Sequence, residues 1–256
     1  MRRPSKVCFR CSILMLCVTQ LLVAPVHGQT SRDPPDTPEE LASRRESLSL
    51  LRQGRFDDLD NKMNWLQRSY ELGRLGDERL LHEFRAFYDT DPALEARYNA
   101  WIGRLPGSYA AWLARGIYYR YRGNQARGSA YISETSRQQL DGMSMYLDKA
   151  MRDYDKSLAL SERPLMSYHA ILGVAMLHGD DDVARKMLDE SVRVDPRNFV
   201  VRYKYFVTLQ TRWGGSLQQM LDFREEARAA GLSEVQLKYF EGMIAVERRW
   251  LKQQGR

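Results

Sequence analysis

Apolar residues recur at helical spacing along most of the chain, whereas runs that alternate apolar and polar residues are scarce. Between residues 37 and 105, four stretches carry apolar residues three and four positions apart, which indicates helices with one buried face. Thr37 and Glu40 can form a capping box that starts the first helix, and Gly54 can end it. The apolar positions of the four predicted helices are Leu41, Leu48 and Leu51; Phe56, Leu59, Met63, Leu66 and Tyr70; Leu80, Leu81, Phe84 and Phe87; and Leu94, Tyr98, Trp101 and Ile102. This pattern predicts an all-α protein that begins with a divergent pair of helical hairpins over 37–105.

After Pro106 the apolar and small residues fit a 34-residue spacing typical of the tetratricopeptide repeat, a unit of two antiparallel helices. The first unit contains Trp112, Gly116 and Tyr119, then Ala150, Tyr154 and Ser157. Its two halves are separated by about 22 residues more than the repeat allows. The surplus predicts either an insertion or a lengthened helix pair near 123–146.

A second unit has the expected length, and a third follows it. In the second unit the matching residues are Tyr168, Ile171, Gly179, Ala184, Leu188, Ser191 and Pro196. Leu172 stands where the repeat has a small residue, and Gly173 is next to it. The third unit begins near Val201 and turns at 213–216, and Ser233 starts a last helix that caps the stack. We therefore expect a tetratricopeptide-like helical-hairpin solenoid with about three repeat units over 106–256.

Two segments of this region resemble an uncharacterised bacterial family with a tetratricopeptide-like domain. One is T-R-W-G-G-S-L-Q-Q-M-L-D-F at 211–223, similar to the P-R-W-G-G-S motif of that family, with Thr211 in place of the usual proline. The other is the A-W-x-A-R-G-x-x-Y stretch at 111–119. The resemblance covers about 94–230, and it implies the fold without implying an activity.

The first 28 residues have the composition of a secretory signal peptide. Four basic residues precede an uncharged, mostly apolar stretch from Ser12 to Val26, which is short for a membrane span. We expect cleavage after Gly28, then a disordered lead-in over 29–36, and a periplasmic or secreted protein with no membrane association after cleavage. An uncleaved tether is the alternative.

Removal of this segment changes the charge and the cysteine content of the chain. The net charge of +6 falls to +2, because the segment carries four basic and no acidic residues. The basic balance then gives no reason to expect nucleic acid as a partner. Cys8, Cys11 and Cys17 also leave, so we expect neither a disulfide nor a thiolate metal site.

The remaining residues do not form a familiar catalytic or cofactor-binding motif. His82-Glu83 begins like a zinc-protease motif, but Ala86 stands where the second histidine would be. Asp180, Asp181 and Asp182 precede a helix, where carboxylates are typical of N-terminal capping. We expect no catalytic residue, no cofactor and no metal, and a protein-interaction module. The alternatives are a hydrolase or carbohydrate-processing enzyme on a helical scaffold and a structural subunit of an envelope assembly.

The candidate partner-binding residues are those that the repeat spacing places on the concave face. They are Arg120, Tyr121, His169, Met176, Arg202, Tyr205 and Arg212. Arginine beside tyrosine suits a peptide with an acidic residue or a C-terminal carboxylate. We expect the double variant Arg120→Ala/Arg212→Ala to lose partner capture and keep its helical circular dichroism. A solvated basic face and a satisfied, half-buried His169 are the structural alternatives.

Overall fold

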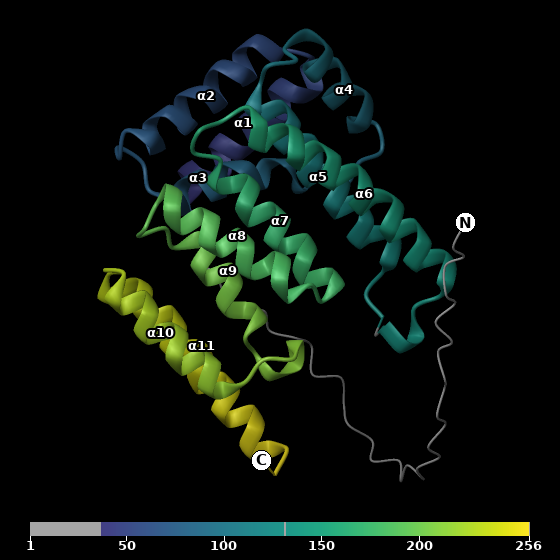
Figure 1. The fold of residues 1–256 in the computed structure, drawn as a ribbon. Coiled ribbons are helices and arrows are strands. Elements are labelled where there is room, and N and C mark those ends of the chain that lie inside the picture. Colours follow the sequence, from purple (N-terminus) through teal and green to yellow (C-terminus); the bar gives the residue numbers. More distant parts are fainter. Residues whose placement is uncertain (1–36, 131, 256) are drawn as a thin grey trace, which may run out of the picture. The chain divides into compact units, whose positions relative to one another are not determined.

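The computed structural model describes residues 37–130 and 132–255, which form eleven α-helices and three short 3₁₀ helices with no strand in these ranges (Figure 1). The protein is therefore all-α. The predicted signal peptide and lead-in lie outside the described residues. Within those residues, no helix has both the length and the apolarity needed to cross a membrane.

The N-terminal region contains α1 (Pro38–Gln53), α2 (Phe56–Glu71), α3 (Asp77–Phe84), η1 (Arg85–Tyr88) and α4 (Leu94–Arg104). The capping box at the start of α1 is confirmed, because Thr37 and Glu40 exchange side-chain-to-backbone hydrogen bonds. Gly54 ends α1 at φ 74°, a left-handed conformation that favours glycine.

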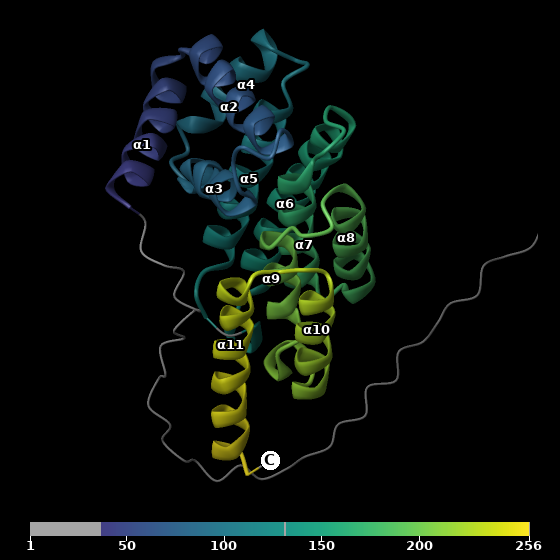
Figure 2. The ribbon, with the colours of Figure 1, turned by 90° about the vertical axis from the view of Figure 1, so that its left-hand side faces the viewer.

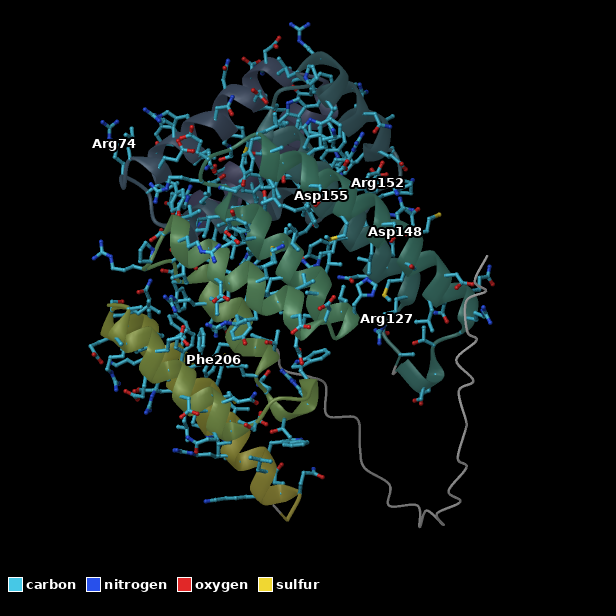
Figure 3. The ribbon with its side chains drawn as sticks, in the orientation of Figure 1. Arg74, Arg127, Asp148, Arg152, Asp155 and Phe206 are labelled. Carbon is cyan, nitrogen blue, oxygen red and sulfur yellow. The ribbon has the colours of Figure 1, made fainter. Side chains whose placement is uncertain are left out.

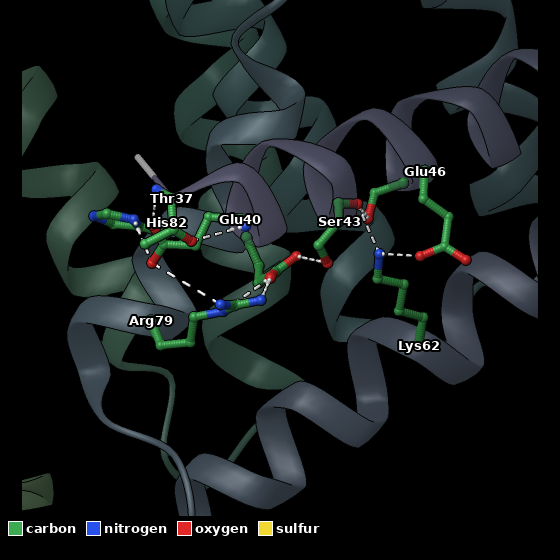
Figure 4. A network of polar contacts seen from close by, with 9 residues as sticks. Thr37, Glu40, Ser43, Glu46, Lys62, Arg79 and His82 are labelled. Atoms are coloured by element: carbon green, nitrogen blue, oxygen red, sulfur yellow. Dashed lines mark hydrogen bonds and ion pairs between the residues drawn. The ribbon is translucent and has the colours of Figure 1, made fainter. Parts of the chain in front are cut away.

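Polar side chains bind α1, α2 and α3 to one another (Figure 4). The buried Glu83 carboxylate accepts hydrogen bonds from Arg79 Nη2 at 2.6 Å and from Ser43 Oγ at 2.8 Å. His82 Nδ1 lies 3.1 Å from Glu40 Oε1, and Lys62 Nζ donates to the Ser43 carbonyl at 2.7 Å. His82 and Glu83 therefore hold helices together.

The first repeat unit is a lengthened helix pair, one of the two alternatives predicted for 123–146. Its helices are α5 (Tyr109–Arg127) and α6 (Arg137–Ala159), with η2 (Ile132–Glu134) between them. Gly116 allows their close contact, because a Cβ there would lie 2.5 Å from Tyr154 Cε1 and 3.2 Å from the Ala150 carbonyl oxygen.

The later hairpins are shorter and their loops tighter. They comprise α7 (Leu165–His178), α8 (Asp181–Val194), α9 (Val200–Thr208), η3 (Thr211–Trp213), α10 (Leu217–Ala229) and α11 (Glu234–Gln253). Asp180 caps α8 by accepting from the Val183 amide at 3.0 Å. Gly214 has φ 95°, and a Cβ on Gly215 would meet the Leu209 carbonyl oxygen at 2.2 Å. The Gly-Gly pair is thus required by the turn into α10.

Two clusters of buried apolar side chains form the interior of the described residues. The larger includes residues between Leu50 and Val201 and so spans the predicted division near residue 105; the smaller includes residues between Leu188 and Ile244. Phe206 on α9, labelled in Figure 3, belongs to the smaller cluster and stacks on Phe240 at 4.5 Å between ring centroids. Trp101 is fully buried, as its helical spacing predicts, whereas Trp213 on η3 is 45% exposed.

The first helices of successive hairpins are neighbours, and α3 with η1 packs against them. Helix α7 contacts both α5 and α9, while α3 contacts α7 and α9, and η1 contacts α5 (Figure 2). Asp77 at the start of α3 accepts hydrogen bonds from the backbone amides of Phe199 at 2.5 Å and Val200 at 2.9 Å. The N-terminal region therefore covers part of the face that the repeat spacing predicts to be open.

Candidate functional site: a basic cluster around His169

Four basic side chains from four different elements interact electrostatically at His169. They are Arg85 on η1, Arg120 on α5, His169 on α7 and Lys204 on α9, and we call them the basic cluster. The charges of Lys204, Arg120 and Arg85 all act on the His169 imidazole. Arg85, His169 and Lys204 are half-buried, whereas Arg120 is only 9% exposed.

The Arg120 guanidinium is held by shape and by aromatic contact. A Cβ on Gly173 would lie 3.0 Å from Arg120 Cζ, so α7 leaves room for the guanidinium at that position. Arg120 Cζ lies 5.3 Å from the Tyr121 ring centroid, and Tyr88 stacks on Tyr121 at 4.0 Å between centroids. Arg120 Nε is buried without a hydrogen-bond partner, and within the described ranges the guanidinium forms no ion pair.

The environment of His169 favours its neutral form. Burial lowers the pKa of His169 well below its usual range, and the positive charges of Lys204, Arg120 and Arg85 lower it further. A neutral imidazole can both donate and accept a hydrogen bond. His169 therefore adds hydrogen-bonding capacity to the basic cluster without a further positive charge at neutral pH.

Tyr154 supplies a second buried polar atom close to Arg120. Its hydroxyl has no hydrogen-bond partner among the described residues, and the side chain is fully buried. Burial raises the pKa of Tyr154, while the nearby Arg120 charge opposes that rise. The hydroxyl is therefore protonated and can donate a hydrogen bond.

The structure brings only part of the predicted residue set together. Arg120, Tyr121 and His169 lie at the basic cluster, and Met176, half-buried, follows His169 by two turns of α7. Arg202 was expected on the same face, but it is 2% exposed, with Nη2 donating to the Pro196 carbonyl at 3.0 Å and Nη1 3.6 Å from Glu226. Arg202 therefore lies against Glu226 of α10, and partner binding by Arg202 stays a prediction.

Tyr205 and Arg212 also lie apart from the basic cluster. The Arg185 guanidinium lies 5.9 Å from the Tyr205 ring centroid, and the ring packs against Phe223 of α10. Arg212 is exposed on η3, where its Nη2 donates to Gln210 Oε1 at 2.8 Å. Arg120 and Arg212 therefore do not form one site, although partner binding by either remains a prediction.

Sequence reasoning missed two members of the basic cluster. Lys204 is two residues beyond Arg202 and therefore faces roughly the opposite way on the same helix. Helix α9 has 9 residues, and its Lys204 lies at a position that the repeat spacing does not place on the concave face. Arg85 lies outside the repeat region, and no spacing rule connects it to α5 or α7. The Gly173 departure from the repeat was the available signal, since it marks the space that Arg120 occupies.

Other charged groups near α5 are satisfied by one another. Arg115 binds Asp153 through two hydrogen bonds of 2.8 and 2.7 Å and also donates to Asn99 at 2.8 Å. Glu95 accepts from the Tyr119 hydroxyl at 2.8 Å and from Lys149 at 3.1 Å. Across the part of the chain that the structure describes, no three His, Cys, Asp or Glu side chains are grouped to hold a metal ion.

The basic cluster is thus suited to binding an oxyanion. Guanidinium and ammonium groups bind carboxylate and phosphate through charge-assisted hydrogen bonds. The half-buried position lowers the competition from water and strengthens such bonds.

Comparison with known proteins identifies the family of the chain. No match was found among curated proteins or among solved structures. A family model described as "Domain of unknown function (DUF4034)" matches residues 44–182, from within α1 to the start of α8, and so includes Arg85, Arg120 and His169. Because this match covers more than half of the chain, the protein belongs to the DUF4034 family.

Proposed function

We propose that the protein is an exported, non-catalytic interaction module that binds an acidic segment of a peptide or protein partner at the basic cluster. The leading 28 residues support export to the periplasm. The observation that carries the proposal is the convergence of Arg85, Arg120 and Lys204 on His169 from three separate parts of the chain.

Positive charges act on His169 from three elements. Like charges that share a half-buried site repel one another. A negatively charged partner segment would add an attraction to each of these cations. Neighbouring repeat helices are a common support for peptide binding, because each contributes side chains to one extended surface.

A charge-matched capture experiment tests the proposal. The protein would be immobilised and used to capture partners from an envelope extract, comparing wild type with Arg85→Gln/Lys204→Gln. We expect the double variant to lose the captured partner, because two of the three cations that converge on His169 are removed. Peptides from that partner would then be tested with their acidic residues intact and neutralised.

The control removes the same charge elsewhere. Arg74 and Arg152 are both exposed, are not among the cations that act on His169, and are both labelled in Figure 3. Arg74→Gln/Arg152→Gln should capture as wild type does. If both double variants lost the captured partner equally, capture would depend on net charge. That result would contradict a site at the basic cluster.

We also propose that the T-R-W-G-G-S segment is a signature shared by relatives of this chain. It lies outside the matched residues 44–182. The support for it is physical: Gly214 needs a left-handed backbone, and Gly215 has no space for a Cβ. An alignment of relatives that lacked both glycines would contradict this assignment.

A further inference from the structure

Three buried or largely buried arginines differ in how they are satisfied. Arg115 forms hydrogen bonds with Asp153 and Asn99, and Arg202 reaches the Pro196 carbonyl and Glu226. Arg120 alone of these three forms no hydrogen bond or ion pair with any described residue. Arg115 and Arg202 thus have structural partners, whereas the donors of Arg120 remain available.

We propose that Arg120, together with the Tyr154 hydroxyl and His169, forms an oxyanion-binding site for a carboxylate or phosphate group. The inference deepens the proposed function, on which it rests for the source of the anion. Arg120 has a planar guanidinium that matches the two oxygens of such a group. Tyr154 adds a buried donor, and both side chains are more than nine-tenths buried with at least one polar atom unpartnered.

The packing around Arg120 holds the guanidinium in place without using its donors. Tyr121 provides an aromatic face at 5.3 Å, which attracts the cation but leaves its N–H groups available. The absence of a Cβ at Gly173 provides the space, since a methyl group there would lie 3.0 Å from Cζ and 3.2 Å from Nη2. A role for Arg120 in binding an anion would explain why residue 173 is a glycine, because a larger residue would displace the guanidinium.

The surrounding charge fits an anion and not a cation. Lys204 and Arg85 contribute positive potential at His169 together with Arg120. Bound oxyanion would reduce the repulsion among these groups and would favour protonation of His169. The site would therefore bind anions more strongly as the pH falls toward the pKa of His169, because the imidazole then gains a charge. The cations that act on His169 are Arg85 on η1, Arg120 on α5 and Lys204 on α9.

The test measures binding of inorganic phosphate and of acetate to the full chain at constant ionic strength. Binding would be followed by the ¹⁵N–¹H signal of the Arg120 side chain and by the shift in melting temperature. Wild type is expected to show saturable binding. Arg120→Met should bind about tenfold to a hundredfold more weakly, because hydrogen bonds to a charged group are lost. Arg74→Met, which removes an exposed charge, should bind like wild type.

A second variant keeps the test informative if Arg120→Met does not fold. Tyr154→Phe keeps the buried ring and removes only the unpartnered hydroxyl, so it should fold and still bind the anions more weakly. The absence of saturable binding in wild type would overturn the proposal, as would equal binding by wild type and Arg120→Met.

Further binding experiments test which molecule supplies the anion, separately from whether the site exists. Peptides of the captured partner would be compared with a free C-terminal carboxylate, with a C-terminal amide, and with acidic side chains replaced by amides. Arg120-dependent binding of any of these peptides supports both the site and the proposed function. Arg120-dependent binding of phosphate with no peptide binding supports the site and contradicts the interaction module.

Discussion

Gly116 shows how one missing methyl group sets the contact between α5 and α6. Its Cα faces the Tyr154 ring, and Tyr154 is fully buried, so neither side can move without disturbing the core. The repeat spacing places a small residue at this position, and the structure supplies the reason. Here the sequence pattern and the packing agree because the constraint is local to one helix pair.

Replacing Gly116 by alanine should destabilise the protein by about 1–3 kcal/mol through overpacking against Tyr154. Gly242→Ala is the matched control, because Gly242 lies in the middle of α11 with no atom within 4 Å of the added Cβ. That variant should gain about 0.5–1 kcal/mol from improved helix propensity. Chemical denaturation measures both, and a stabilising Gly116→Ala would contradict the close contact.

His169 should make the stability of the protein depend on pH. Its pKa is lowered by burial and by Lys204, Arg120 and Arg85, so the unfolded chain binds a proton at a higher pH than the native state does. The free energy of unfolding should therefore fall as the pH drops below about 6.5, the value for an unperturbed histidine. The slope for one proton is at most about 1.4 kcal/mol per pH unit.

The measurement is urea denaturation of wild type and His169→Gln between pH 7.5 and pH 5. The difference in the free energy of unfolding between wild type and His169→Gln should change with pH. A constant difference between wild type and His169→Gln would show that His169 titrates alike in both states.

Helix ends were the most predictable elements, because capping depends on residues only three positions apart. Ser233 starts α11 as expected and forms a capping box with Gln236, and Ser108 caps α5. The candidate site was less predictable, since its members come from η1, α5, α7 and α9. Periodicity identified Arg120 and His169, but the short α9 and the packing of η1 on α5 are tertiary features that spacing does not encode.

Asp77 connects two elements that are distant in sequence. It lies at the start of α3, and its carboxylate accepts from the first amides of α9, more than 120 residues away. Asp77→Ala should cost about 2 kcal/mol, because a helix cap is lost and two amides are left without this partner. Hydrogen exchange should show lower protection at the first turn of α9 and in α3.

Asp180→Ala provides the matched comparison, since Asp180 is an exposed cap of the adjacent helix α8. We expect a smaller loss of about 1 kcal/mol, confined to the first turn of α8. If both variants loosen only the helix that they cap, α3 is not held to α9 by Asp77.

At the scale of the molecule, the two apolar clusters meet mainly through α9. Tyr205 packs against both clusters, while α10 contacts α9 and α11. Figures 1 and 2 both show α10 and α11 side by side at the C-terminal end of the described region. In a stack of helical hairpins each unit depends on its neighbours, so an end unit can open before the rest.

Phe240→Ala should therefore loosen the C-terminal hairpin selectively. Phe240 is fully buried and packs against Phe206, Phe223 and Phe199, so its truncation should cost about 3–5 kcal/mol. Hydrogen exchange should show lost protection in α10 and α11, with α5 and α6 retaining theirs. Phe87→Ala, which removes a fully buried ring from the larger cluster, should instead reduce protection in the N-terminal region and α5. If each variant instead lost protection uniformly over all the helices, the two clusters would unfold as one cooperative unit. The contacts of α9 would then transmit the whole destabilisation from one cluster to the other.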